Sequence, residues 1–243
     1  MSLYRDEAIV LRTQKLGEAD RIITLLTREH GRIRGVAKGV RRTKSKFGAR
    51  LEPGSHIDIQ LYTGRTFDTV TQVESIFNYG EALTDDYSRW TIAGAILEAA
   101  ERFTSHEHEP ALQEFKLVTG AMKALAEEKY DPSMILDAYL LRSLAVGGYA
   151  PSLTNCSKCD APGPHRYFSL VGGGLVCADC RPSASATPAP ETLKLMSDLI
   201  SGDWESAMAS ELRNRREANG LIAAYLQWHL ERGLRSLQLV ERA

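Results

Sequence analysis

The sequence lacks any apolar run of the roughly 18 residues that a helix needs to cross a bilayer. Its first twenty residues also lack the unbroken apolar stretch of a signal peptide, because Arg5, Asp6, Glu7 and Arg12 interrupt it. We therefore expect a cytoplasmic protein with no membrane partner. With 243 residues and 43% hydrophobic composition, the chain can bury enough apolar surface for two or three modules.

Motifs for covalent chemistry are also missing. No G-x-G-x-x-G follows a strand-like run, and the glycines at 172–174 are not followed by the Lys and Ser/Thr of a phosphate-binding loop. A zinc deaminase needs an H-x-E element before its cysteines, whereas His229-Leu230-Glu231 comes after them. No catalytic constellation is present, so we expect neither an enzyme nor a small-molecule substrate.

Acidic residues are nearly missing from residues 28–50. This stretch holds nine Lys and Arg residues against one acid, Glu29, for a net charge of +8. Residues 51–110 hold three basic and eleven acidic residues, for a net charge of −8, so the total of −1 hides a strong segregation. Segregation of this kind predicts a polyanion site on the N-terminal module.

Residues 1 to about 78 carry five short β-type runs, at 7–13, 21–27, 32–37, 56–61 and 66–76. Polar and apolar residues alternate strictly from His56 to Leu61, as in a half-buried strand. The run at 21–27 also suits a helix, but Gly31 and the β-branched content favour a strand. Five short strands in so few residues predict a small closed barrel, most simply a five-stranded OB-fold.

Helical periodicity follows from about residue 81 to 148 and resumes after 190. Asp131-Pro132 is typical of a cap followed by proline at the first helical position. We expect Trp90, Phe103 and Phe115 to be core residues, and the late helices to dock on the middle ones. Residues 181–190, RPSASATPAP, have too little apolar content to pack and are expected to form a linker.

The four cysteines form two C-x-x-C pairs separated by seventeen residues: Cys156, Cys159, Cys177 and Cys180. Two-residue spacers let both thiolates of a pair bind one ion, and a hairpin turning at the triple glycine brings the pairs together. The spacing predicts one structural Zn²⁺ in a closed S₄ shell. Disulfides are the alternative, and a redox pair a weaker one. The module acts either as a staple or as a contact surface through Lys158, His165 and Arg166.

The predicted fold class is therefore α+β and multidomain. An N-terminal five-stranded OB-fold β-barrel is followed by an all-helical domain with an inserted four-cysteine zinc module. The expected bounds are 1–80 for the barrel, 81–152 for the first helical part, 153–182 for the zinc module and 183–243 for the second helical part.

The basic run KGVRRTKSKFGAR, residues 38–50, is the candidate polyanion site. Its glycines keep the backbone flexible, Arg32 and Arg34 flank Ile33 and are expected to point outward, and Phe47 offers a ring on which a base can stack. The residues predicted to bind a nucleic acid are Arg32, Arg34, Lys38, Arg41, Arg42, Lys44, Lys46, Phe47 and Arg50. The alternative is a solvated loop that only keeps the protein soluble. A solvated loop is also expected at His106-Glu107-His108-Glu109, in preference to a ligand cluster.

Short strings occur in a characteristic order along the chain: AIVL at 8–11, GEAD at 17–20, GRI at 31–33, VAKGVRR at 36–42, SKFGA at 45–49, LEP at 51–53, LRSL at 141–144, GYAP at 148–151, YF at 167–168 and GG at 173–174. This ordered series resembles RecO, the family of bacterial recombinational repair mediators. The resemblance spans nearly the whole chain and is weakest at 81–130 and after 181.

The resemblance implies a non-enzymatic protein that binds single- and double-stranded DNA and anneals strands. It also implies that the protein helps to load RecA onto DNA coated by the single-stranded DNA-binding protein, SSB. The implied partners are RecR and the C-terminal tail of SSB, and the implied location is cytoplasmic and nucleoid-associated. Arg102, Arg142 and Arg232 are candidates for the tail pocket. Two alternatives stay open: an RNA-binding factor and a protein-interaction adaptor.

Overall fold

The computed structural model describes residues 2–230 and 233–240. It divides the chain into two compact units, Met1–Lys129 and Tyr130–Ala243. Helices that follow the barrel in sequence thus belong to both units. The bounds 1–80, 81–152, 153–182 and 183–243 stay a prediction.

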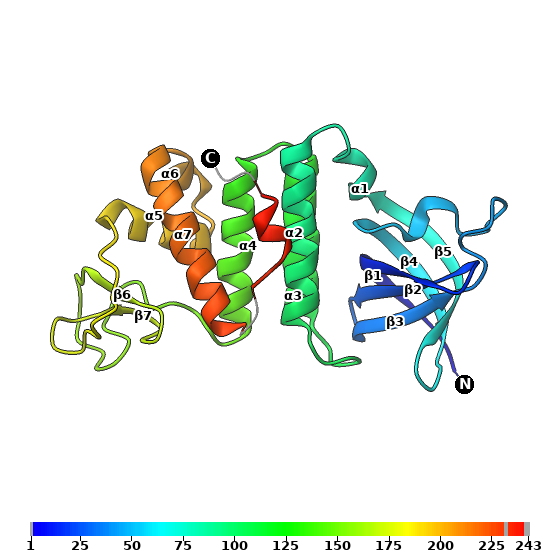
Figure 1. Cartoon of the computed structure of the whole chain (residues 1–243), viewed down its shortest axis with the longest axis horizontal. Helices are drawn as coiled ribbons and strands as arrows, with labels where there is room; N and C mark the ends of the chain where they lie inside the picture. The colour runs from blue at the N-terminus through cyan, green and yellow to red at the C-terminus, as the bar shows by residue number, and fades with distance from the viewer. Residues whose placement is uncertain (1, 231–232, 241–243) are drawn as a thin grey trace. The chain divides into compact units, whose positions relative to one another are not determined.

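The first unit begins with five strands that form a closed barrel in the order β1-β2-β3-β5-β4 (Figure 1). The strands are β1 (Leu3–Leu16), β2 (Asp20–Thr27), β3 (Gly31–Ala37), β4 (Ser55–Tyr62) and β5 (Asp68–Asn78). All neighbours are antiparallel except β3 and β5, which run parallel. The predicted five-stranded OB-fold and its helical continuation, which carries the four cysteines, are confirmed.

One long strand closes the barrel. β1 pairs with β4 through residues 3–9 and with β2 through residues 8–16, and a register shift lies between Val10 and Arg12. A bulge of this kind bends a strand, which lets β1 take part in both halves of the wall. The strict alternation in β4 places Ile57, Ile59 and Leu61 in the core with no exposed surface. Each such side chain contributes about 1.5–3 kcal/mol of burial free energy.

Three helices complete the first unit: α1 (Tyr79–Ala82), α2 (Tyr87–Phe103) and α3 (Leu112–Ala126). Phe115 is buried as expected, and Phe103 is half-buried. Trp90 was expected in the core, but its side chain is 46% exposed, so this prediction is wrong. It lies in the first turn of α2, where it lines a small apolar cavity together with Pro53 and Met122.

The second unit is built around α4 (Pro132–Val146), on which α5 (Pro190–Ser201) and α7 (Leu212–His229) pack; the short α6 (Trp204–Met208) contacts α5. The predicted start of α4 is confirmed, because Asp131 Oδ1 accepts hydrogen bonds from the backbone N–H groups of Ser133, at 2.9 Å, and Met134, at 3.3 Å. The late helices thus dock on the last of the middle helices.

A two-stranded hairpin, β6 (Tyr167–Ser169) and β7 (Gly174–Val176), leads into the segment expected to be a linker. Part of that segment packs: Ala186 and Phe168 exchange backbone hydrogen bonds of 2.8 and 2.9 Å, and Pro188 is buried. The expectation was wrong here because backbone pairing holds the segment where apolar side chains are few. Within the described ranges, no helix has the length and apolar character to span a membrane.

Candidate nucleic-acid interface and metal centre

The basic loop, residues 38–54, joins β3 to β4 and includes a short 3₁₀ helix, η1 (Gly48–Leu51). Six of its cations are exposed: Lys38, Arg41, Arg42, Lys44, Lys46 and Arg50. In residues 2–230 and 233–240, no carboxylate lies within ion-pair distance of any of the six. Their charge is therefore available to an external polyanion.

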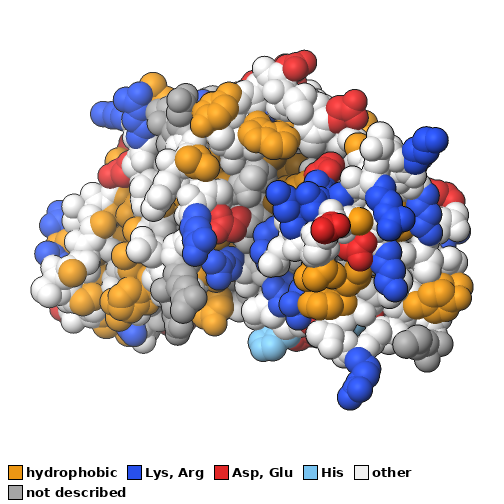
Figure 2. Space-filling view, turned by 45° about the vertical axis from the view of Figure 1, so that its right-hand side comes forward, with side chains coloured by type: hydrophobic (Ala, Val, Ile, Leu, Met, Phe, Trp, Pro, Cys, Tyr) orange, Lys and Arg blue, Asp and Glu red, His pale blue; other side chains and the backbone are white. Residues whose placement is uncertain are grey.

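Three of the cations are held by backbone carbonyls. Arg41 donates to the carbonyl of Glu18 at 2.8 Å, Lys46 Nζ to that of Thr71 at 2.9 Å, and Arg50 to that of Lys46 at 3.2 Å. A carbonyl orients a cation without cancelling its charge, so the loop is partly pre-organised. In the space-filling view of Figure 2, Lys and Arg side chains gather on the right-hand part of the molecular surface, with a few Asp and Glu side chains among them.

Phe47 does not offer the predicted stacking surface. Its side chain is only 2% exposed and belongs to the barrel core, together with Val40 and Leu51 from the same loop. The prediction is wrong because burial of the apolar ring in the barrel core stabilises the protein more than an exposed ring would, even though its neighbours in sequence are charged. Phe47 instead anchors the loop, and the Nζ of Lys46 lies 4.9 Å from its ring centroid.

Replacing Phe47 by alanine is expected to cost about 3–5 kcal/mol of unfolding free energy, because it leaves a cavity in the barrel core. Urea unfolding of the full chain measures this cost. Phe47→Leu, which keeps most of the apolar volume, is the control and is expected to retain nucleic-acid binding. If a Phe47→Leu protein of normal stability bound nucleic acid more weakly, Phe47 would have to stack on a base, as the sequence predicted.

Arg32 and Arg34 leave β3 on the side opposite Ile33, as the alternation predicts, but they do not extend the exposed track. The side chain of Arg32 is only 16% exposed and donates to the carbonyl of Ser105 at 2.5 Å. Arg34 Nε lies 2.5 Å from Glu107 Oε1. A carboxylate thus neutralises the charge that the sequence assigned to phosphate, and the expected continuous track is interrupted.

Most of segment 105–109 is exposed in the loop between α2 and α3, as the sequence suggested, but its backbone also pairs with β3. The N–H of His108 donates to the carbonyl of Arg32 at 2.9 Å, and Glu107 forms a parallel bridge to Arg32. A Cβ on Gly31, where φ is +68°, would lie 1.7 Å from the carbonyl oxygen of Glu109, so only glycine fits beneath the segment. The side chains of His106 and Glu109 match the expectation, because they are 82% and 70% exposed.

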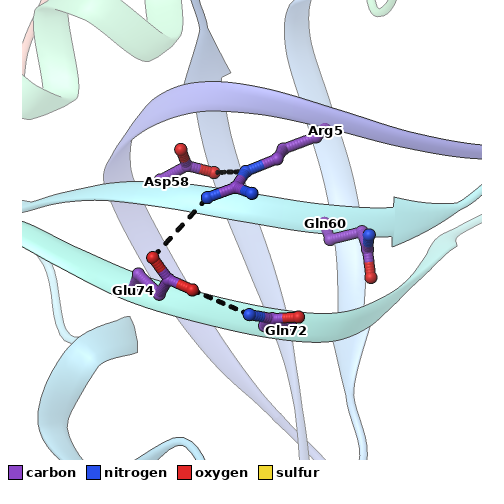
Figure 3. A pocket seen from close by; sticks show the side chains of 5 residues that line it. All are labelled: Arg5, Asp58, Gln60, Gln72 and Glu74. Carbon is purple, nitrogen blue, oxygen red and sulfur yellow. Dashed lines mark hydrogen bonds and ion pairs between the residues drawn. The ribbon is translucent and has the colours of Figure 1, made fainter.

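Another charged group on the barrel does not suit a polyanion (Figure 3). Arg5 Nε lies 2.5 Å from Asp58 Oδ1, and its Nη2 lies 3.5 Å from Glu74 Oε2. Gln72 donates to Glu74 at 2.7 Å. Two carboxylates surround one guanidinium, so this group of side chains carries a net negative charge and does not attract phosphate.

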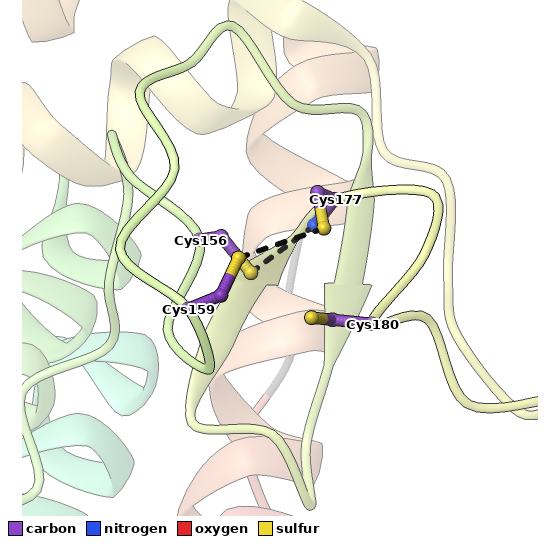
Figure 4. Close-up of side chains that lie close together, drawn as sticks. All are labelled: Cys156, Cys159, Cys177 and Cys180. Atoms are coloured by element: carbon purple, nitrogen blue, oxygen red, sulfur yellow. Dashed lines mark hydrogen bonds between the residues drawn. The ribbon is translucent and has the colours of Figure 1, made fainter.

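The four cysteines come together at one point of the second unit (Figure 4). Their sulfur atoms all lie within 4.8 Å of one another. The first pair precedes β6 and the second follows β7, so the predicted hairpin joins them. Gly174, with φ at +128°, lets the hairpin pass the backbone of Ser152, which a Cβ would approach to 2.4 Å. The clustering that a metal shell requires is confirmed.

The chemistry of the thiols fits a cation. A hydrogen bond from the backbone N–H of Cys177 lowers the pKa of Cys156 to about 6, which favours its thiolate. Hydrogen bonds with neighbouring thiols, first Cys177 and then Cys159, raise the pKa of Cys180 to about 12, which favours its protonated form. A bound metal ion favours the thiolate form of its cysteine ligands. The disulfide alternative does not hold in the structure, where all four cysteines are free.

The arginines considered for a tail pocket have different environments. Arg142 donates to the carbonyl oxygens of Leu199, at 2.8 Å, and Ile200, at 3.2 Å, and so caps the end of α5; its burial lowers its pKa. It is therefore a structural residue. Arg102 is exposed in the last turn of α2, whereas Arg232 lies outside the described residues.

Comparison with known proteins gives a match along nearly the whole chain. The profile described as Recombination protein O N terminal matches residues 1–79, and that described as Recombination protein O C terminal matches residues 84–238. Proteins named DNA repair protein RecO are 60% identical in Thermobifida fusca, 59% in Streptomyces avermitilis and 54% in Frankia casuarinae, each over 100% of both chains. The chain therefore belongs to the RecO family of DNA repair and recombination proteins.

Proposed function

We propose that this protein is a non-enzymatic, DNA-binding recombination mediator whose basic loop binds the phosphate backbone. The observation that carries the proposal is the set of six exposed cations on one loop of an OB barrel, none paired with a carboxylate within the described residues. OB barrels bind single-stranded nucleic acids through positively charged grooves. The DNA repair role of the family supports DNA as the polyanion.

Strand annealing needs no covalent chemistry. Two complementary strands repel one another, and Lys and Arg residues that neutralise phosphates lower that repulsion while releasing counterions. Because phosphate contacts carry no sequence information, the protein can hold any strand, and base pairing selects the partner. The described site accordingly needs exposed cations, and no nucleophile or general base.

The partners proposed are single- and double-stranded DNA, RecR and the C-terminal tail of SSB, through which the protein helps to load RecA. The RecO resemblance supports these partners, and a cytoplasmic, nucleoid-associated location goes with them. Because Arg142 caps a helix, Arg102 is the remaining described candidate for contact with the acidic tail.

We further propose that the four cysteines hold one structural Zn²⁺. Zinc is the usual ion of a four-cysteine shell with this spacing. Four protein ligands close the shell, so Cys156, Cys159, Cys177 and Cys180 would fix the hairpin and leave no position for an activated water.

Competition between oligo(dT) and oligo(U) for the full chain tests the function, together with an annealing assay on complementary DNA strands. The expected result is preferential DNA binding and faster annealing than without protein. Preferential RNA binding would favour the alternative of an RNA-binding factor. Failure to bind either oligonucleotide would favour an adaptor and overturn the proposal.

Glu107→Gln is expected to strengthen binding to single-stranded DNA, because it removes the carboxylate that neutralises Arg34 and lies near Arg32. Each cation that gains a phosphate adds about 0.7 to the log-log salt slope. Titrations with oligo(dT) between 50 and 300 mM NaCl measure the slope. Glu109→Gln is the control, since Glu109 contacts neither arginine through its carboxylate. Equal slopes for the two variants would mean that Glu107 only holds its own segment in place.

A further inference from the structure

Two guanidinium groups converge on one tyrosine of the hairpin in the second unit. The guanidinium carbon of Arg181 lies 4.3 Å from the ring centroid of Tyr167, and that of Arg166 lies 5.0 Å from it. Arg166 Nη2 also donates to the Tyr167 hydroxyl at 2.8 Å. Both cations are exposed. The three residues form what we term the arginine–tyrosine cluster.

The backbone holds this cluster in place at two points. Tyr167 begins β6, and it projects to the face opposite Phe168, which is buried. Arg181 directly follows Cys180 of the sulfur cluster, and five residues later Ala186 pairs with Phe168 through two backbone hydrogen bonds. The segment carrying Arg181 is thus fixed beside β6 at both of its ends.

The two charges are not balanced by an acid in the part of the chain that the structure describes. Within residues 2–230 and 233–240, neither Arg166 nor Arg181 lies within ion-pair distance of a carboxylate. Both lie within 5.0 Å of one ring centre, so their mutual distance does not exceed the Debye length of about 10 Å at 0.1 M salt. They therefore repel one another, and an anion between them would relieve the repulsion. The pKa of Tyr167 is lowered, first by the Arg166 hydrogen bond and also by Arg181, as expected where positive potential is concentrated.

We propose that Arg166, Tyr167 and Arg181 form a second phosphate-binding site, which takes a backbone phosphodiester of DNA. This inference rests on the proposed function and adds a contact on the second unit to the basic loop of the first. Guanidinium forks match the paired oxygens of a phosphate, and the tyrosine ring holds both forks in fixed orientations. Such a contact reads no sequence, as strand annealing requires.

A purely electrostatic role of Arg181 beside the cysteines is the alternative to phosphate binding. Arg181 is adjacent to Cys180, and its charge could serve only to offset thiolates in the sulfur cluster. That role requires neither Arg166 nor the hydrogen bond to the Tyr167 hydroxyl. It would change metal retention when Arg181 is removed, and it would leave the salt dependence of DNA binding unchanged.

The test compares three full-length proteins: the wild type, Arg166→Ala/Arg181→Ala, and the control Arg213→Ala. Arg213 is an exposed arginine of the same unit whose side chain is 75% exposed and pairs with Glu211. Oligo(dT) binding is measured by fluorescence anisotropy between 50 and 300 mM NaCl, together with metal content and thermal unfolding. The double variant is expected to lose about 1.4 from the log-log salt slope and roughly tenfold in affinity at low salt. Arg213→Ala is expected to match the wild type.

A double variant that keeps its metal and its stability but binds like Arg213→Ala would overturn the inference. If the double variant loses metal, Arg166→Gln decides, because residue 166 is not adjacent to a cysteine: a slope lowered by about 0.7 supports the site, and an unchanged slope overturns it. A parallel titration of a basic-loop variant keeps the two proposals apart. If the basic-loop variant loses binding and the double variant does not, this second site is refuted and the proposed function stands.

Discussion

Replacing Arg41, Arg42, Lys44 and Lys46 together by alanine is expected to lower the affinity of the full chain for oligo(dT) about 100-fold at 50 mM NaCl. The same variant is expected to lose about 2.8 from the log-log salt slope, since each lost phosphate contact on a single strand removes about 0.7. The four side chains are exposed and make no ion pair with a described carboxylate, so their loss should leave the barrel intact. Anisotropy titrations from 50 to 300 mM NaCl provide both numbers.

A matched control removes the same charge elsewhere. Lys116, Lys123, Arg213 and Arg216 are also exposed, and their combined replacement changes the net charge by the same amount. This control is expected to keep most of the wild-type slope. If both quadruple variants lose the same slope, binding reflects total charge and not the loop. An unaltered slope in the loop variant would remove the loop from the DNA site.

Replacing Cys156 by serine is expected to abolish stoichiometric metal binding and to reduce the solubility and thermal stability of the second unit before it reduces DNA affinity. Cys156 is 2% exposed, and its sulfur accepts a hydrogen bond from the N–H of Cys177 at 3.3 Å, so it is the most enclosed of the four cysteines. Structural zinc sites contribute about 10–16 kcal/mol of apparent binding free energy at neutral pH, which is large beside the stability of a small module.

Metal content per chain and the unfolding temperature measure this effect, and a strong chelator added to the wild-type protein should reproduce it. Ser157→Ala is the control. This neighbour lies outside the sulfur cluster, and its hydroxyl has no hydrogen-bond partner within the described residues, so its removal should alter neither quantity. A Cys156→Ser protein with full metal content would show that the cysteines do not form one shell.

Local patterns predicted most of the fold. Alternation identified β4, the Asp131-Pro132 cap located the start of α4, and the paired C-x-x-C spacings identified the sulfur cluster. These features depend on residues close together in sequence, where backbone geometry fixes the outcome. The short helices α1 and α6 were not predicted, because four or five residues are too few for a helical period to be visible.

The parts of the site that the sequence did not reveal depend on distant contacts. Glu107 forms an ion pair with Arg34, which lies 73 residues earlier in the sequence. Arg181 contacts Tyr167 because the chain reverses direction between them. Phe47 is surrounded in sequence by charge, yet the barrel offers it an apolar interior. The sequence held one signal of such a distant contact, Gly31. A glycine is required there because the backbone of Glu109 passes too close for a side chain.

In the proposed function, cations of this protein bind the charge of the DNA backbone and not its bases. The decisive measurement compares binding of the full chain to an oligo(dT) of natural backbone with binding to an oligo(dT) of the same length in which uncharged methylphosphonates replace the phosphodiesters. We expect tight, strongly salt-dependent binding to the first and no measurable binding to the second. Equal affinity for the two oligonucleotides would refute binding through the phosphate charge.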